Sequence, residues 1–321
     1  MNPPETGAEQ PPLGAIPSTV VPRYAGKSTF ARIADIGEVT DYEIAVLGVP
    51  FDGGTSYRPG ARFGPMAVRQ AARTLRPGYH VELGVTPLQE VQIVDAGDIT
   101  VTPFDIDEAC RQIQQHMREV IGARERRVVA IGGDHTIALP ALRALHGVHG
   151  PLALVHFDAH LDTWDTYFDA PVTHGTIFRR AFEEGLLVPD HSIHIGIRGP
   201  VYDRIDLNED ARMGFRTIRA GDLDVMGVDA AVDAVRRRVG DVPVYLSIDI
   251  DVLDPAFAPG TGTPESGGLT ARELLRMLRN LHGLNLVGAD VVEVSPAYDH
   301  AEITSIAAAT VVFDLLALMT A

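Results

Sequence analysis

The sequence is poor in cysteine: Cys110 is the single thiol among 321 residues. One thiol forms neither an internal disulfide nor a thiolate metal cluster, which excludes disulfide-stapled scaffolds and cysteine-based zinc sites. Cys110 lies in FDIDEACRQIQQHMREVI (104–121), where apolar residues recur at helical spacing, so we expect it to pack inside the protein. This cysteine usage fits a reducing cytoplasm.

Long apolar runs and excess basic charge are also missing. No stretch approaches roughly 18 uninterrupted apolar residues, so we expect no membrane-spanning helix. Lys and Arg number 27 against 43 Asp and Glu, which gives a formal net charge of −16. Nucleic acids and anionic membranes need a basic surface, so neither is an expected partner.

Several common motifs are absent as well. No GxxxxGK[ST] loop occurs, and GTGTPE (260–265) departs from GxGxxG at its last position, which argues against a nucleotide-binding α/β protein. Neither a GxSxG elbow nor an HExxH helix supports other hydrolase chemistries.

The first 22 residues contain six prolines, no basic cluster and no apolar core of a signal sequence. This composition is typical of neither a secretory signal nor a mitochondrial presequence. It also resists helix and sheet, so we expect residues 1–22 to form an irregular arm and residues 23–321 to form one domain.

Apolar, β-branched runs alternate with helical patterns along the rest of the chain. Eight such runs predict strands at about 44–49, 91–94, 128–131, 152–157, 193–197, 215–218, 243–248 and 286–292. Helices are expected at 105–122, 136–146, 228–239, 270–281 and near 303–319. This alternation predicts an α/β fold with a parallel sheet covered on both faces. Ligands bind such sheets beyond the carboxyl ends of their strands.

Two of the predicted strands end in acidic and imidazole side chains. VHFDAHLDT (155–163) places Asp158, His160 and Asp162 after one strand. VYLSIDIDVLDP (244–255) places Asp249 and Asp251 after another. Taken singly, each Asp could be a helix N-cap or a loop carboxylate.

Two further strands end in the same way. His135, in AIGGDHT, follows the strand predicted at 128–131, and Glu293 follows LVGADVV. GGDHT alone could be a glycine turn with Asp134 as a capping residue. Because all four strand ends should meet at one edge of one sheet, their joint occurrence predicts a metal site there.

The charge of this cluster indicates how many metal ions it holds. Four of its members are carboxylates: Asp158, Asp162, Asp249 and Asp251. Crowded carboxylates stay ionised only if positive charge lies among them, and two divalent cations would balance four negative charges. His135 and His160 would complete the coordination shells, and a metal pair also activates water as a nucleophile near neutral pH. This ligand set favours Mn²⁺ over structural Zn²⁺, with iron, cobalt and nickel left open.

Three segments carry a resemblance to a known family. GGDHT (132–136), DAHLD (158–162) and SIDIDVLDPAFAPGTGTP (247–264) resemble the signature motifs of the ureohydrolases, which include arginase, agmatinase and guanidinobutyrase. The resemblance implies a three-layer α/β/α fold, arginase/deacetylase-like, with a mostly parallel sheet of about eight strands. It also implies two Mn²⁺ per subunit, hydrolysis of a small guanidino compound to urea and an amine, and a homo-oligomer, either a trimer or a hexamer.

The resemblance further assigns roles within the site. One metal ion would bind His135, Asp158, Asp162 and Asp249, and the other Asp158, His160, Asp249 and Asp251, so that Asp158 and Asp249 bridge. Glu293 matches the glutamate that pairs with the guanidinium, which agrees with the preference of a planar guanidinium for a carboxylate. His174, in VTHGT, matches a cleft histidine with a proton-shuttle role; without that match it resembles an ordinary loop histidine. Asp251 is also placed to take part in catalysis, as a ligand facing the substrate.

The sequence indicates the guanidinium head of the substrate better than it indicates the tail. The loop TWDTYFDAPVT (163–173) carries Asp165 and no basic residue, which favours a cationic tail, as in agmatine. Trp164 and Tyr167 could cover a methylene chain or simply pack. In FDGGTSYRPGARFGP (51–65), Arg58 could bind a carboxylate tail or hold a glycine-rich turn. We therefore expect an agmatinase, with a guanidino-acid hydrolase such as guanidinobutyrase as the alternative.

Two other classes of protein remain to be weighed. A deacetylase would share the fold, but a mononuclear zinc site would not need both acid pairs, and GTGTPESGG (260–268) also argues against it. A non-catalytic metal-binding relative would be expected to lack some of the ligands, and this sequence keeps all six.

Overall fold

The computed structural model describes residues 11–320. Part of the expected N-terminal arm, residues 1–10, lies outside the described residues. Residues 11–22 form neither helix nor strand. They are nonetheless attached to the body of the protein, because the Leu13 amide donates to Gln92 Oε1 (2.7 Å) and the Ile16 amide donates to the Arg32 carbonyl (3.2 Å).

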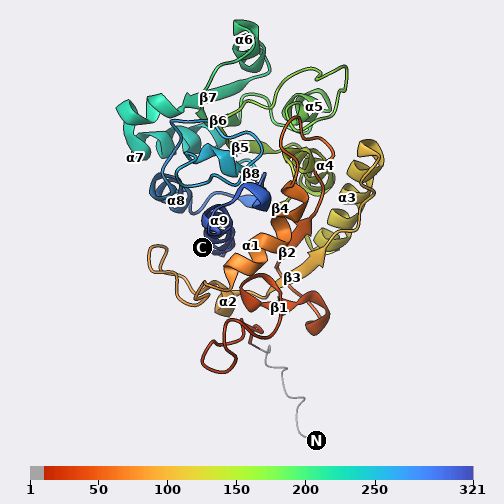
Figure 1. Ribbon diagram of the computed structural model, residues 1–321, viewed down its shortest axis with the longest axis vertical. Coiled ribbons are helices and arrows are strands. Elements are labelled where there is room, and N and C mark those ends of the chain that lie inside the picture. Colours follow the sequence, from red (N-terminus) through yellow and green to blue (C-terminus); the bar gives the residue numbers. More distant parts are fainter. Residues whose placement is uncertain (1–10, 321) are drawn as a thin grey trace, which may run out of the picture.

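Nine parallel strands form a single sheet that runs the length of the molecule (Figure 1). In chain order the strands are β1 (Ala34–Asp35), β2 (Ile44–Val49), β3 (Ile93–Asp98), β4 (Arg127–Gly132), β5 (Ala153–Phe157), β6 (Ser192–Ile197), β7 (Phe215–Arg219), β8 (Val244–Asp249) and β9 (Leu286–Val292). All eight predicted strands are present. The ninth, β1, has only two residues and pairs with β3, so no apolar run announces it in the sequence.

Helices cover both faces of the sheet. They are α1 (Gly64–Ala72), α2 (Pro87–Glu90), α3 (Ile106–Ile121), α4 (Ala138–His149), α5 (Ile177–Glu183), α6 (Arg204–Arg212), α7 (Ala220–Val239), α8 (Ala271–Arg279) and α9 (Ile303–Leu318). Figure 1 shows α1, α7, α8 and α9 on one face and α3, α4 and α5 on the other. Each face has its own hydrophobic core, so the predicted three-layer α/β/α architecture is confirmed.

Local sequence explains the helices that were expected. Helix α8 begins after Thr270, whose hydroxyl accepts from the Glu273 amide while the Glu273 carboxylate accepts from the Thr270 amide. Its buried residues Leu274, Met277 and Leu278 recur at helical spacing. In α7, Gly227 has a φ of 77°, which interrupts the helix and makes the regular part begin where the sequence predicts it.

Helices α1, α2, α5 and α6 were not anticipated, because each has nine residues or fewer, which is too short to show a helical period. Helix α6, RIDLNEDAR, is mostly polar and begins after Asp203, which caps it.

The order of the strands determines where a ligand can bind. The sheet runs β1-β3-β2-β4-β9-β8-β5-β6-β7, so the consecutive strands β4 and β5 are separated by β9 and β8. The register aligns Ile131 with Val291, Asp249 with Val292, and Phe157 with Ile248, which brings the carboxyl ends of these four central strands to one level. Such a switch in strand order opens a crevice beyond the strand ends.

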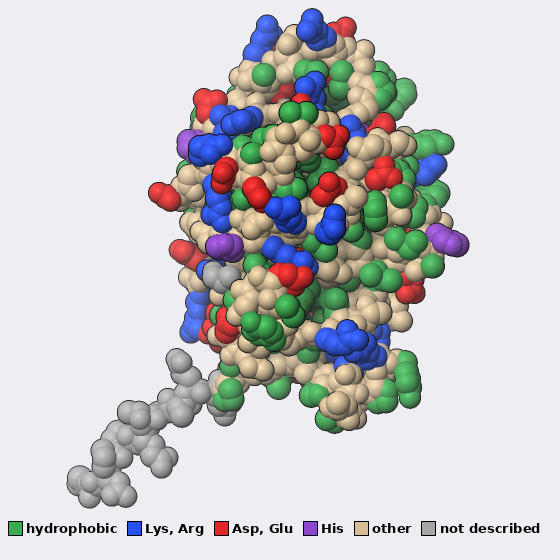
Figure 2. Space-filling view, turned by 90° about the vertical axis from the view of Figure 1, so that its left-hand side faces the viewer, with side chains coloured by type: hydrophobic (Ala, Val, Ile, Leu, Met, Phe, Trp, Pro, Cys, Tyr) green, Lys and Arg blue, Asp and Glu red, His purple; other side chains and the backbone are tan. Residues whose placement is uncertain are grey.

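The surface carries charges of both signs on the face shown in Figure 2. On the face that carries α7, α8 and α9, basic and acidic side chains are interspersed among hydrophobic ones (Figure 2). Within residues 11–320, no helix is long and apolar enough to cross a membrane.

Candidate metal centre and its cavity

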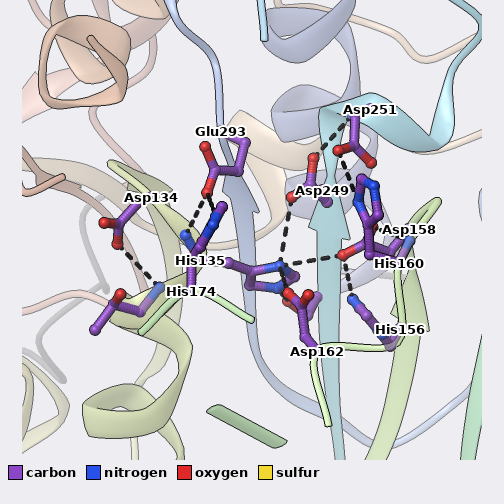
Figure 3. Close-up of polar contacts among 12 residues, drawn as sticks. Asp134, His135, His156, Asp158, His160, Asp162, His174, Asp249, Asp251 and Glu293 are labelled. Atoms are coloured by element: carbon purple, nitrogen blue, oxygen red, sulfur yellow. Dashed lines mark hydrogen bonds and ion pairs between the residues drawn. The ribbon is translucent and has the colours of Figure 1, made fainter. Parts of the chain in front are cut away.

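The carboxyl ends of β4, β5 and β8 bring the six predicted metal ligands together (Figure 3). His135 Nδ1 lies 2.9 Å from Asp162 Oδ2, 3.2 Å from Asp158 Oδ2 and 3.4 Å from Asp249 Oδ2. This first group corresponds to the ligand set that the sequence predicts for one metal ion.

A second group adjoins the first through Asp158. His160 Nδ1 lies 3.2 Å from Asp251 Oδ2 and 3.3 Å from Asp158 Oδ1. Asp158 therefore presents one oxygen to each group, which is the placement a bridging carboxylate needs. The backbone fixes these positions: the Asp251 amide donates to Asp249 Oδ1 (2.8 Å), and the His160 amide donates to Asp158 Oδ1 (2.6 Å).

The negative charge buried in the cluster favours the binding of cations. Burial, together with the charges of Asp251 and Asp158, raises the pKa of Asp249 well above its ordinary range. His135 Nδ1 is buried among three carboxylates without an aligned hydrogen-bond partner. A buried nitrogen in that position and a set of carboxylate oxygens fit divalent metal ions bound by nitrogen and oxygen ligands.

Side chains that the sequence analysis did not single out hold His135 in place. Its Nε2 contacts Ser247 Oγ (2.8 Å), and Ser247 Oγ in turn donates to Asp290 Oδ1 (2.7 Å). Tyr245 Oη donates to the other oxygen of the same carboxylate. Ser247 and Asp290 are paired across β8 and β9, a relation that only the sheet order reveals. A hydrogen bond to the far nitrogen of a histidine ligand fixes its ring orientation.

Glu293 lies beside His135 and is held in an unusual backbone conformation. Its φ is 64°, a left-handed value that few residues other than glycine adopt, which suggests a functional constraint. Oε1 accepts from the His135 amide (3.0 Å) and lies 2.9 Å from His174 Nδ1. Oε2 is buried and has no hydrogen-bond partner among the described residues, although Gly262 leaves open space near it. A buried, unpartnered carboxylate oxygen is suited to a cationic ligand.

The surroundings of His174 favour its protonated form. Burial disfavours its charged form, but the hydrogen bond and the charge of Glu293 outweigh that effect and raise the pKa of His174 to about 9. Its Nε2 contacts Ser56 Oγ (2.8 Å). Asp134 supports the same region by accepting from the amides of Gly54 (2.7 Å) and Thr136 (3.0 Å). Burial and the nearby charge of Glu293 raise the pKa of Asp134 to about 7.

A cavity of about 360 Å³ opens over the cluster. His160, Asp162, Asp249 and His174 form its floor. Its mouth is aromatic and is lined by Tyr57, Trp164, Tyr167 and Tyr202. The Trp164 and Tyr167 rings are stacked with centroids 5.7 Å apart, and the Trp164 and Tyr202 centroids lie 5.2 Å apart. Trp164 and Tyr167 therefore both face the cavity and pack against each other.

Three of the predicted substrate-binding residues, Glu293, Asp165 and Arg58, lie outside this lining. Asp165 is largely exposed and forms an ion pair with Arg180 (2.6 Å), so the expectation that it attracts a cationic tail is not supported by its position. The Arg58 guanidinium packs over the Tyr298 ring, 5.1 Å from its centroid, and over the Tyr57 ring. Tyr57 adjoins Arg58 in the sequence, but the pairings with Tyr298 and with Arg180 were not visible there, because these partners come from other segments.

Arg198 is the one guanidinium or ammonium group among the described residues that line the cavity. Its Nη2 donates to the carbonyls of Asp251 (2.6 Å) and Glu265 (2.7 Å), and its Nη1 donates to the Val252 carbonyl (3.2 Å). Both terminal nitrogens of Arg198 already bind backbone oxygens, and its Nε is buried without a hydrogen-bond partner among the described residues, so Arg198 braces the loop of Asp251 rather than offering a site for an anion.

A larger hollow, of about 1100 Å³, lies between α1 and residues 27–35 and contains none of the predicted site residues. Its buried guanidinium, Arg69, is already bound by Asp95 through two hydrogen bonds of 2.8 and 2.9 Å. The larger hollow therefore offers neither the predicted metal ligands nor a free guanidinium, whereas His160, Asp162 and Asp249 line the smaller cavity.

The chain is similar to known proteins over most of its length. The model of the arginase family matches residues 42–318. A guanidinopropionase from Pseudomonas aeruginosa is 47% identical, over 93% of each chain. An agmatinase from Enterobacter sp. is 44% identical, over 86% of this chain and 87% of its own. The solved structure of proclavaminate amidino hydrolase from Streptomyces clavuligerus is 44% identical with a TM-score of 0.88, covering 93% of this chain and 99% of that one.

Proposed function

Because the chain belongs to the arginase family, we propose that it is a binuclear manganese hydrolase that cleaves the guanidino group of agmatine to putrescine and urea. One juxtaposition carries this proposal. The cluster of His135 and three carboxylates lies beside Glu293, whose buried, unpartnered Oε2 would bind a guanidinium.

Two Mn²⁺ are proposed to occupy the cluster. His135, Asp158, Asp162 and Asp249 would hold one ion, and Asp158, His160, Asp249 and Asp251 the other. Oxygen ligands with two imidazoles suit Mn²⁺. When bound, a metal pair lowers the pKa of water and so supplies a nucleophile near neutral pH.

Side chains of the protein, as distinct from the metal ions, orient the substrate and transfer the proton. Glu293 Oε2 binds the guanidinium and holds its carbon over the metal centre, while Oε1 keeps its hydrogen bonds to His135 and His174. The amine that leaves must gain a proton. His174 is protonated at neutral pH because its pKa is about 9, so it donates that proton through Nε2 while Nδ1 stays bound to Glu293.

A pH dependence follows from the Glu293–His174 pair. We expect kcat/KM to fall as pH rises through about 9, where His174 loses its proton. His174→Asn should lose about 100-fold or more in kcat and should lack this alkaline limb. A pH series of initial rates measures both effects. If the variant kept the same limb, the assignment of the proton donor to His174 would be wrong.

The same pair contributes to stability with a defined sign. The pKa of folded His174 lies above its ordinary value of 6.5, so its contribution is fully present below pH 6.5 and is lost as pH rises through about 9.

The aromatic mouth supports a cationic tail. Trp164 and Tyr167 line the cavity with aromatic rings, which attract an ammonium group, and Arg198, the cation in the lining, is engaged by backbone carbonyls. This argument replaces the one based on Asp165. A guanidino acid, such as 4-guanidinobutanoate, is the second candidate. It is favoured by the likeness to guanidinopropionase, with Arg58 as the group that would bind its carboxylate.

The substrate is tested by urea release from Mn²⁺-loaded protein with agmatine, 4-guanidinobutanoate, 3-guanidinopropanoate and arginine side by side. We expect agmatine to have the highest kcat/KM. A preference for a guanidino acid would overturn the choice of agmatine and direct attention to Arg58. No urea from any of them would overturn the proposed reaction.

A matched pair of variants separates the two arguments about the tail. Tyr167→Leu should raise the KM for agmatine by about 5-fold or more, because a cation–π contact contributes roughly 1 kcal/mol. Asp165→Asn should change it by less than about 2-fold, because an exposed ion pair contributes little. The reverse ranking would restore Asp165 as the selector.

Two further features complete the proposal. A cytoplasmic location rests on the single, buried Cys110. A homo-oligomer, trimer or hexamer, rests on the family resemblance of the sequence.

A further inference from the structure

Three buried polar side chains extend from Asp158 into the protein, away from the cavity. His156 Nε2 lies 2.8 Å from Asp158 Oδ2, and His156 Nδ1 lies 2.7 Å from His194 Nδ1. His194 Nε2 lies 3.1 Å from Asp210 Oδ1, an ion-pair contact rather than an aligned hydrogen bond. The four residues form a continuous chain across β5, β6 and α6, and none of the last three faces solvent.

The sheet and its aromatic neighbours fix this chain in one arrangement. His156 and His194 are paired directly across β5 and β6 and are fully buried. The His156 ring packs on Phe178 with centroids 4.5 Å apart, and the His194 ring packs on Phe215 with centroids 4.6 Å apart. Rings enclosed in this way do not rotate freely, so their nitrogens keep their directions.

The contacts among these four side chains show which ring nitrogens donate a proton and which accept one. A neutral imidazole has one N–H, whereas an imidazolium has two. The two aligned contacts are satisfied when His156 donates its one proton to Asp158 and His194 donates from Nδ1 to His156, with Nε2 of His194 lying beside Asp210.

A direct role of His156 as a metal ligand is less favourable. Its Nε2 lies close to His135, Asp158 and Asp162, so distance alone would permit it. Both of its ring nitrogens, however, already contact other side chains, Asp158 and His194.

Asp210, the last of these four side chains, also contacts the loop that carries Asp158 and Asp162. The Thr163 hydroxyl donates to Asp210 Oδ1 (3.1 Å), and Thr163 directly follows the ligand Asp162. Arg179 Nε donates to the Thr163 carbonyl (2.9 Å). Asp210 therefore supports the ligand loop at two points, through the histidines at Asp158 and through Thr163 beside Asp162.

We propose that His156, His194 and Asp210 are positioning residues of the metal centre, which orient Oδ2 of Asp158 so that its remaining lone pair faces a metal ion. This inference rests on the proposed function only in requiring that the cluster bind metal. A carboxylate ligand that is itself held by a hydrogen bond binds metal more tightly, and loss of such a partner typically costs about 10- to 100-fold in affinity or activity.

Variants of His194 and Asp210 test the proposal in the full chain. Asp210→Asn keeps the shape of the side chain and removes its charge. His194→Asn can still bond to His156 through an atom near the position of Nδ1, whereas His194→Gln can bond only near the position of Nε2, towards Asp210. The readouts are Mn²⁺ affinity, from titration of metal-stripped protein with Mn²⁺, and the melting temperature of the metal-stripped protein.

A matched control comes from a second buried histidine–carboxylate pair. His80 Nε2 lies 2.8 Å from Asp314 Oδ1, both side chains are buried, and neither contacts the metal cluster. His80→Gln should lower the melting temperature and leave Mn²⁺ affinity within about 2-fold.

The expected result is a 10- to 100-fold loss of Mn²⁺ affinity in Asp210→Asn and His194→Gln, with a smaller loss in His194→Asn. Lower melting temperatures with unchanged Mn²⁺ affinity would overturn the proposal and make the chain a structural element like His80. If a His194 variant fails to fold, the Mn²⁺ affinity of Asp210→Asn alone tests the proposal. Failure of the proposed function looks different, because wild type would then bind Mn²⁺ without releasing urea.

Discussion

Asp158→Asn is expected to abolish Mn²⁺ retention and urea release together. Asp158 presents Oδ2 to His135 and Oδ1 to His160, so it is shared by both proposed metal positions, and an amide replaces one of these oxygens by a donor. Activity should fall by at least about 10³-fold, because the nucleophile depends on bound metal. Metal content per subunit and urea release measure the two effects on one preparation.

Asp254→Asn is the matched control for this substitution. Asp254 lies in the loop after β8, close to the ligand Asp251, and its carboxylate accepts from the amides of Ala256 (2.9 Å) and Gly267 (2.8 Å) instead of facing the cluster. This control should retain metal and activity. An Asp158→Asn variant that kept full metal content and turnover would contradict the bridging assignment.

Glu293→Gln is expected to separate metal binding from catalysis. Glu293 touches His135 through the backbone amide and not through its ring, so the metal ligands remain in place. The substrate loses its buried counter-charge, which should lower kcat/KM by about 100-fold or more, since such pairs contribute roughly 3 kcal/mol. The alkaline limb should also shift to lower pH, because the charge of Glu293 raises the pKa of His174.

Glu302→Gln supplies the control. Glu302 has a φ of 61°, close to that of Glu293, but it is exposed at the start of α9. The comparison therefore removes any effect of placing glutamine in a left-handed conformation. If Glu293→Gln lost Mn²⁺ as well, Glu293 would have to be regarded as part of the metal centre.

Much of the fold and of the candidate site could be predicted from local sequence. Central strands buried on both faces consist of continuous apolar runs, and β5 and β8 are followed immediately by Asp158 and by the Asp249–Asp251 pair. Since parallel strands present their carboxyl ends at one edge, residues at those ends were expected to meet. The roles of Glu293 and His174 stay predictions until they are measured.

Other features of the protein depend on contacts between distant segments. The role of Asp165 at the cavity mouth stays a prediction, and the structure pairs this residue with Arg180, 15 residues away. The two-residue β1 has no apolar signal of its own, and it forms because β3 offers it an edge.

The sequence by itself determined the residue types of the site and the strand ends that carry them, because burial of strands and the charge of their endings are local properties. Only the tertiary structure decided which side chains support the ligands. His156 and His194 are 38 residues apart and meet because β5 pairs with β6. Pairing of strands is selected by the free energy of the whole sheet, which no local pattern contains.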